Sequence, residues 1–125
     1  VDSIRKNRDR LATSRIRTSI FSRRNKTKNL TLMTKVNWTF QTLSDLEEIH
    51  AFHEKKSLSY ADFLIDEILS VGDKLEKFPR LGKVVKEMNK KSIREVVVRD
   101  YRVIYSLPDL QIVKILTVHP CKIPL

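Results

Sequence analysis

A few side chains in the second half of this sequence are of types that could do chemistry. His119 ends an apolar run, and because imidazole titrates near neutral pH it could move a proton or could serve only the structure. Arg94 and Arg102 could bind an anion, or could pair on a strand surface with carboxylates such as Glu87 or Glu95. Both interpretations stay open at this stage.

Other kinds of reactive site find little support. His50 and His53 lie three residues apart on a predicted helix, but no third metal ligand is evident. Cys121 is the single cysteine, and no partner histidine or helix N-terminus that would activate it as a nucleophile is evident. The sequence has no Gly-rich phosphate loop and no Ser-centred nucleophile motif. We therefore expect neither a metal nor an organic cofactor.

Charge is distributed unevenly along the chain. The 125 residues include 25 Lys and Arg against 15 Asp and Glu, a formal net charge of +10. Residues 1–32 hold ten of the basic side chains and two of the acidic ones, so they carry a net charge of +8. Such a segment, poor in large apolar residues, is predicted to be a disordered extension. It could precede a true start at Met33, or it could be an arm that binds nucleic acid.

Residues 33–125 are predicted to form one domain. They carry a net charge of only +2, and no stretch of the chain is apolar for long enough to span a membrane. A single cysteine fits a reducing compartment, and we expect a cytoplasmic protein. The alternation of Val36, Trp38 and Phe40 predicts a strand. The capping box from Ser44 to Glu47 then predicts a helix that runs to about residue 55. Its expected buried stripe consists of Leu46, Ile49 and Phe52.

A second helix is expected to begin at Ser57 or Ser59 and to end at Pro79 and Gly82. Its apolar side chains recur every three or four residues, which places them on one face: Ala61, Leu64, Ile68, Val71, Leu75 and Phe78. The short connection between the two helices predicts an antiparallel hairpin.

The rest of the chain favours strands over residues 83–88, 93–99, 101–107 and 112–118, with turns at Arg99-Asp100 and Pro108-Asp109. We therefore expect an α+β domain of the order β-α-α-β-β-β(-β), with a helical hairpin packed on a small antiparallel sheet. Tyr101 and Tyr105 should share one face of their strand and pack in the core.

Several short motifs stand in a definite order between residues 35 and 122. Trp38 lies on the first strand, and the others are Ser44-Asp45-Leu46-Glu47-Glu48-Ile49, Phe78-Pro79-Arg80-Leu81-Gly82, Val84-Val85-Lys86-Glu87, Ser92-Ile93-Arg94-Glu95, Asp100-Tyr101-Arg102-Val103-Ile104-Tyr105 and Val118-His119. In this order and at these distances they resemble the RelE/ParE superfamily of bacterial type II toxins. The long hairpin and the Ile-Arg-Glu and Tyr-Arg strands are more similar to the ParE-like branch.

The resemblance implies a small toxin of a plasmid stabilisation-type system, held silent by a cognate antitoxin that covers an apolar groove between hairpin and sheet. ParE-like members poison DNA gyrase by binding it. RelE-like members enter the ribosome and cleave mRNA without a metal, and in that case Arg94, Arg102, His119 and Lys122 would line one cationic groove as catalytic residues. A third hypothesis is a non-enzymatic module that binds nucleic acid through residues 1–32.

Overall fold

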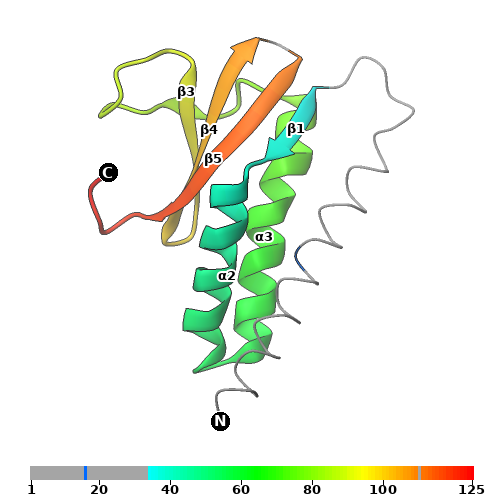
Figure 1. Cartoon of the computed structure of the whole chain (residues 1–125), viewed down its shortest axis with the longest axis vertical. Coiled ribbons are helices and arrows are strands. Elements are labelled where there is room, and N and C mark those ends of the chain that lie inside the picture. The colour runs from blue at the N-terminus through cyan, green and yellow to red at the C-terminus, as the bar shows by residue number, and fades with distance from the viewer. Residues whose placement is uncertain (1–15, 17–33, 110) are drawn as a thin grey trace.

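A computed structural model describes residue 16 and residues 34–109 and 111–125. Two antiparallel helices lie across one face of a single sheet, as Figure 1 shows. The elements are β1 (Lys35–Trp38), α2 (Phe40–Glu54), α3 (Leu58–Lys77), β2 (Lys83–Val84), β3 (Ile93–Val98), β4 (Tyr101–Asp109) and β5 (Ile112–Pro120). The predicted α+β class and element order are confirmed. The predicted extension lies outside the described residues, apart from Ile16, which is helical and buried in the core.

The sheet is mixed, with the strand order β1-β5-β4-β3-β2. The strands β2, β3, β4 and β5 pair antiparallel, as the hairpin turns predict, but β1 pairs parallel to β5 with Val36 opposite Val113. The antiparallel pairing predicted for the strands after Gly82 is confirmed, and β1 adds a parallel pair that the sequence did not indicate. The reason is that β1 and β5 are joined through the whole domain, so no turn between them could indicate their direction.

The first helix begins five residues earlier than the capping box predicts. Thr39 is its N-cap, and the Oγ1 of Thr39 accepts a hydrogen bond from the backbone N–H of Thr42 at 3.4 Å. Phe40 therefore belongs to the helix, and Ser44 lies inside it. The same Thr39 hydroxyl donates to the carbonyl of Ile115 at 2.6 Å, so the cap also ties the helix to the sheet. The predicted burial of Phe52 is wrong, because its side chain is 64% exposed.

The second helix follows its predicted pattern closely. Ser57 caps it by accepting from the backbone N–H of Tyr60 at 3.1 Å. Five of the six residues in its predicted stripe are buried, whereas Phe78 lies beyond the last turn and is 63% exposed. Gly72 allows this helix to approach β1, since a Cβ atom there would lie only 2.7 Å from the ring of Trp38.

The core lies between the hairpin and the sheet. It is built from one face of each helix and from alternate residues of the central strands. Tyr101, Val103 and Tyr105 point into it from β4, which confirms the packing role predicted for the two tyrosines. Its most deeply buried large side chains are Leu46, Leu64, Ile68, Leu69, Leu75, Tyr105 and Ile115.

The segment after α3 is held by polar contacts rather than by a long strand. Only Lys83 and Val84 pair with β3, so the predicted strand over residues 83–88 is too long. The hydroxyl of Tyr105 accepts from the backbone N–H of Gly82 at 2.9 Å and donates to the carbonyl of Pro79 at 2.8 Å. A Cβ atom on Gly82 would lie 2.6 Å from the carbonyl oxygen of Glu95, so glycine is required at this close approach.

The two hairpin turns differ in how well the sequence places them. The turn at Arg99-Asp100 is confirmed, and Arg99 takes a positive φ of 52° there. The turn predicted at Pro108-Asp109 comes slightly later, because β4 continues through Asp109. The carboxylate of Asp109 accepts from the backbone N–H groups of Gln111 and Ile112 at 2.7 and 3.1 Å, and this Asx-type turn starts β5.

Candidate binding groove

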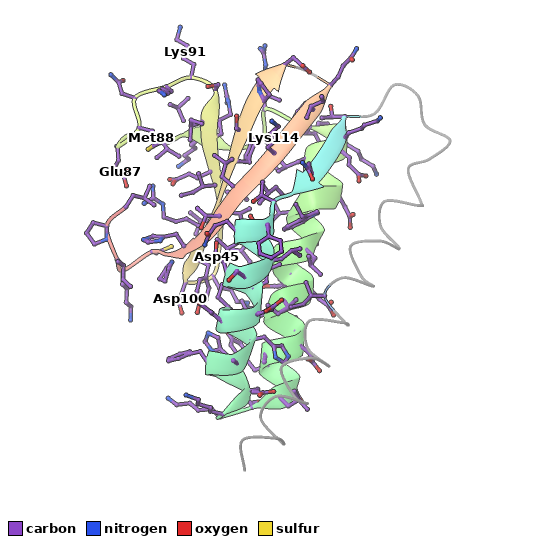
Figure 2. The ribbon with its side chains drawn as sticks, in the orientation of Figure 1. Asp45, Glu87, Met88, Lys91, Asp100 and Lys114 are labelled. Atoms are coloured by element: carbon purple, nitrogen blue, oxygen red, sulfur yellow. The ribbon has the colours of Figure 1, made fainter. Side chains whose placement is uncertain are left out.

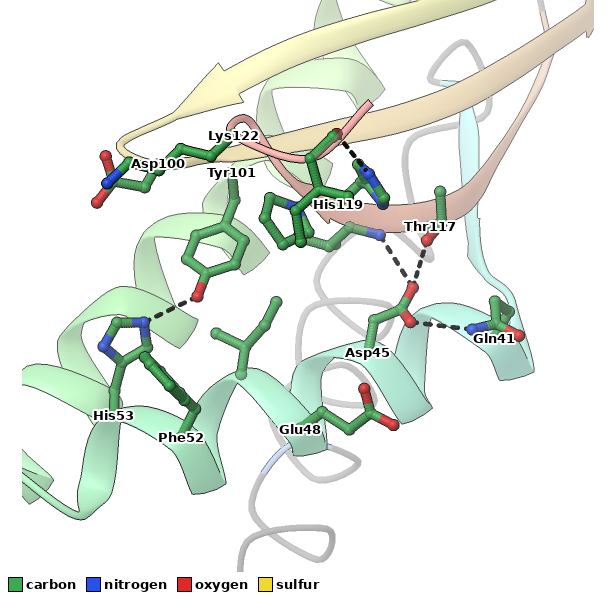
Figure 3. Close-up of a pocket in the computed structure, with 14 residues that line it drawn as sticks. Gln41, Asp45, Glu48, Phe52, His53, Asp100, Tyr101, Thr117, His119 and Lys122 are labelled. Carbon is green, nitrogen blue, oxygen red and sulfur yellow. Dashed lines mark hydrogen bonds between the residues drawn. The ribbon is translucent and has the colours of Figure 1, made fainter. Parts of the chain in front are cut away.

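An open groove of about 840 Å³ lies between α2 and the end of β5 (Figure 3). Its surface is mainly apolar, with contributions from Ile49, Phe52, Tyr101, Val118, Pro120 and Ile123. The charged side chains that line it are Asp45, Glu48 and Asp100 on the acidic side and Lys122 on the basic side. The expected apolar groove is therefore present, but the expectation that it is cationic is wrong.

The groove exists because β1 covers only half of the neighbouring strand. The parallel pairing ends where Trp38 faces Ile115, and the chain then turns into α2. Beyond Ile115, no strand of the described part of the chain pairs with this edge of β5. Asp45 of α2 takes up part of this edge, since its Oδ2 accepts from the backbone N–H of Val118 at 3.1 Å and from the hydroxyl of Thr117 at 2.5 Å.

Aromatic side chains close one end of the groove. His53 and the hydroxyl of Tyr101 are hydrogen bonded at 2.9 Å, and the rings of Phe52 and Tyr60 stand edge-on to the imidazole with centroids 5.0 and 5.3 Å away. Burial raises the pKa of Tyr101 above its ordinary value of 10.0, with help from the negative charge of Asp100. This phenol therefore stays neutral over the physiological range and serves as a fixed polar point in an apolar wall.

Arg102 is held by two carboxylates on the face of the sheet away from the helices. Its Nη1 donates to Glu87 at 2.8 Å, and its guanidinium also pairs with Glu95. These hydrogen bonds, that to Glu87 first, raise the pKa of Arg102 above its ordinary value. The side chain is only 12% exposed, so the strand-surface pairing weighed in the sequence is confirmed for Arg102.

Arg94 faces the other way. It stands opposite Tyr105 in the β3–β4 register, whereas Arg102 stands opposite Val97, three residues further along β3. Because side chains alternate along a strand, positions three apart point to opposite faces. Arg94 donates from Nη1 to the carbonyls of Gly82 and Arg80 at 2.9 and 3.4 Å, so it holds the chain after α3 rather than pairing with a carboxylate.

The four predicted site residues are therefore divided. His119 stands opposite Arg102 in the β4–β5 register, and together with Lys122 it lines the groove. The Nε2 of His119 donates to the carbonyl of Ile123 at 2.8 Å and so orders the chain after β5. Arg94 lies on the opposite face of the sheet, so the expectation that all four line one groove is wrong. Their catalytic role stays a prediction.

Comparison with known families agrees with this architecture. A model of the ParE toxin of the type II toxin-antitoxin system, parDE, matches residues 36–122 of the chain. The chain belongs to the ParE toxin family. The matched range begins in β1 and ends after β5, so it takes in both the hairpin and the whole sheet.

A solved structure from the chromosomal ParDE TA system of P. aeruginosa has a similar fold, with a TM-score of 0.59. The match covers 70% of this ParE family chain and 96% of that chain, at 14% sequence identity. No curated protein sequence matches the chain. In the described ranges, no helix is both long and apolar enough to cross a membrane.

The contacts that shape the groove of this ParE family member could not be found by inspection of the sequence. Thr42 donates its hydroxyl to the carbonyl of Ile115 at 2.7 Å, and Asp45 bonds to Val118 across 73 residues. Asp45 falls within the motif of the first helix, but nothing in the local pattern indicates that its partner is the edge of β5. That partner follows only from the sheet order.

Proposed function

We propose that this ParE family chain is a toxin that arrests growth by poisoning DNA gyrase in the cytoplasm, and that a cognate antitoxin neutralises it. The proposed action is recognition of a protein surface, with no catalytic step. The rival function is ribosome-dependent cleavage of mRNA, which would need cations gathered around a phosphate and a group that removes the proton of the 2′-hydroxyl.

The observation that carries the proposal is the state of the two arginines. Arg102 already binds two carboxylates, Glu87 and Glu95, so a phosphate would have to displace them. Arg94 donates to backbone carbonyls and lies on the other face of the sheet. Arg94 is therefore turned away from His119, and Arg102, which stands opposite His119, is already engaged by carboxylates. This supports binding over catalysis.

The groove supports the second half of the proposal. Apolar surface of this extent, open at one side, is typical of sites where another protein segment binds. Phe52 is 64% exposed on one side of the groove and Ile123 is 54% exposed on the other. An apolar segment of the antitoxin would bury both. Where it passes Glu48 and Asp100, neutral or basic side chains of the antitoxin are expected.

Expression of the full chain in bacterial cells tests the target. A gyrase poison should produce DNA breaks and a DNA-damage response before translation fails. An mRNA nuclease should produce in-frame cuts in translated messages and rapid loss of protein synthesis. Co-expression of the gene beside the toxin should restore growth if it encodes the antitoxin. In-frame cuts without DNA breaks would overturn the proposal in favour of the ribosome as target.

A further inference from the structure

The segment of residues 80–91, called the basic loop below, carries a dense set of exposed positive charges. It has a single carboxylate, that of Glu87, and all five of its cations are exposed: Arg80, Lys83, Lys86, Lys90 and Lys91. In Figure 2, Lys91 points away from the body of the protein at the end opposite to the tip of the hairpin.

Within residues 34–109 and 111–125, none of these five cations forms a salt bridge. Among the described residues, the carboxylates that form salt bridges do so with His50, Arg99 and Arg102, and none pairs with a cation of the basic loop. Glu87 is bound to Arg102 instead. The charge of the basic loop is therefore not tied up in salt bridges and can attract an external anion, although Lys86 also interacts electrostatically with Glu87.

The basic loop is also held in a defined shape. Val85 at its centre is completely buried, and the backbone N–H of Val85 donates to the carbonyl of Ile93 at 3.0 Å. The carbonyl of Val85 in turn accepts from the N–H groups of Met88 and Asn89, each at 3.3 Å. A cationic surface that is already ordered loses less conformational entropy when it binds a partner.

Charge is divided between the helical hairpin and the part of the domain that follows it. The two helices α2 and α3 contain nine carboxylates against two lysines, a net charge of −7. Residues 78–125, which contain β2 to β5, hold ten Lys and Arg against four carboxylates, a net charge of +6. An extended anion would therefore be attracted to the sheet side at the basic loop and repelled by the hairpin.

We propose that the basic loop binds the phosphate backbone of duplex DNA. Lysines supply point charges that neutralise phosphates without reading the sequence. The exposed apolar residues of the loop are aliphatic, Leu81, Val84 and Met88, and it contains no aromatic ring on which unpaired bases could stack. This feature favours a duplex over single-stranded RNA. The inference deepens the proposed function, and rests on it, because gyrase would bring DNA within reach of the toxin.

The test compares two matched pairs of exposed lysines in the full chain. The variant Lys90→Gln/Lys91→Gln removes two charges from the basic loop. The control Lys55→Gln/Lys56→Gln removes two adjacent charges at the hairpin tip, next to the acidic helices. Binding of a labelled 20-base-pair duplex of arbitrary sequence is followed by fluorescence anisotropy over a series of salt concentrations, without gyrase.

Each phosphate contact contributes a slope of about 0.9 to the fall of log affinity with log salt concentration. The slope of the Lys90/Lys91 variant should be smaller than that of the wild type by about 1.8, and the slope of the control should not change. Equal slopes for both variants would overturn the proposal. The same measurement is repeated with a labelled single-stranded RNA as the probe. A smaller slope for the Lys90/Lys91 variant with this RNA, but not with the duplex, would overturn the proposal in favour of an RNA contact. Because gyrase is absent, either failure leaves the gyrase result in cells unaffected.

Discussion

The groove beside α2 and the basic loop, which contains β2, lie at opposite edges of one sheet, and they differ in how they are built. The groove is apolar with acidic residues along it. Two of the residues that line it, Ile49 and Val118, are also buried core residues, so the core fixes the shape of the groove. The basic loop is charged, and it is kept in place by hydrogen bonds that Arg94 and Arg102 donate to it and by one that the hydroxyl of Tyr105 accepts from it. The groove suits an apolar segment of a protein, and the basic loop suits a polyanion.

The two arginines of the family motifs, Arg94 and Arg102, have a structural role at the basic loop. Arg94 and Arg102 hold the chain that leaves α3 from the two faces of the sheet, one through carbonyls and one through Glu87. Arg102 engages Glu87, the one carboxylate of the basic loop, so that no lysine of the basic loop forms a salt bridge among the described residues. The strand arginines therefore act as supports, and the loop lysines carry the exposed charge.

The largest effect is expected at the support of the basic loop. Gly82→Ala would place a Cβ atom 2.6 Å from the carbonyl oxygen of Glu95 and 2.8 Å from the ring of Tyr105. Such overpacking should lower the free energy of unfolding by about 1–3 kcal/mol in urea denaturation. Amide exchange should speed up in residues 80–91 more than in α2. The exposed neighbour variant Lys83→Ala is the control and should change stability little. Unchanged stability in Gly82→Ala would mean that the backbone at Gly82 is not packed tightly against Glu95 and Tyr105.

A smaller and more selective effect is expected at the groove. Phe52→Ala removes an exposed ring from the groove wall. Because a few aromatic side chains supply much of the binding energy in many interfaces, the variant should bind the purified antitoxin about tenfold more weakly in a titration. Phe40→Ala removes a ring that is 80% exposed on the same helix but outside the groove, so it should bind almost like the wild type. Equal binding by both variants would show that the antitoxin does not use the groove.

The smallest effect concerns pH. The hydrogen bond from Arg102 lowers the pKa of Glu87 below its ordinary value of 4.5. A carboxylate with a lowered pKa in the folded state stabilises the fold above its unfolded pKa, and this contribution is lost as the pH falls through the folded value. Glu87→Gln should therefore be less stable than the wild type at neutral pH, and the difference should shrink as the pH falls below 4.5 and vanish once the pH is below the lowered pKa of the folded state. Glu48→Gln, which removes a carboxylate that does not contact Arg102, should not reproduce this difference in thermal melts.

Much of the fold could be predicted because its signals are local. The stripe of α3 from Ala61 to Leu75, the cap at Ser57 and the turn at Arg99-Asp100 each depend on residues within a few positions. The start of α2 could not be predicted in the same way. Thr39, and not Ser44, is the N-cap of α2. The hydroxyl of Thr39 also donates to the carbonyl of Ile115, which only the folded sheet brings close.

The candidate site was harder to predict for the same physical reason. Whether Arg94 and Arg102 share a face depends on strand register, and the sequence motifs place both in strands without fixing that register. Pairing of Arg102 with Glu87 and Glu95 was foreseen as one of two interpretations, and it is the one that the structure contains. The role of Asp45 at the edge of β5 depends on β1 ending early, which no local pattern indicates.

Purified components test directly whether this protein poisons DNA gyrase. DNA gyrase and supercoiled plasmid are incubated with the purified full chain, and cleaved DNA is measured after the proteins are denatured. Our account predicts that linear DNA accumulates in proportion to the toxin and only when gyrase is present, and that the antitoxin suppresses it. Unchanged gyrase cleavage, together with cutting of mRNA on translating ribosomes by the same preparation, would contradict the account.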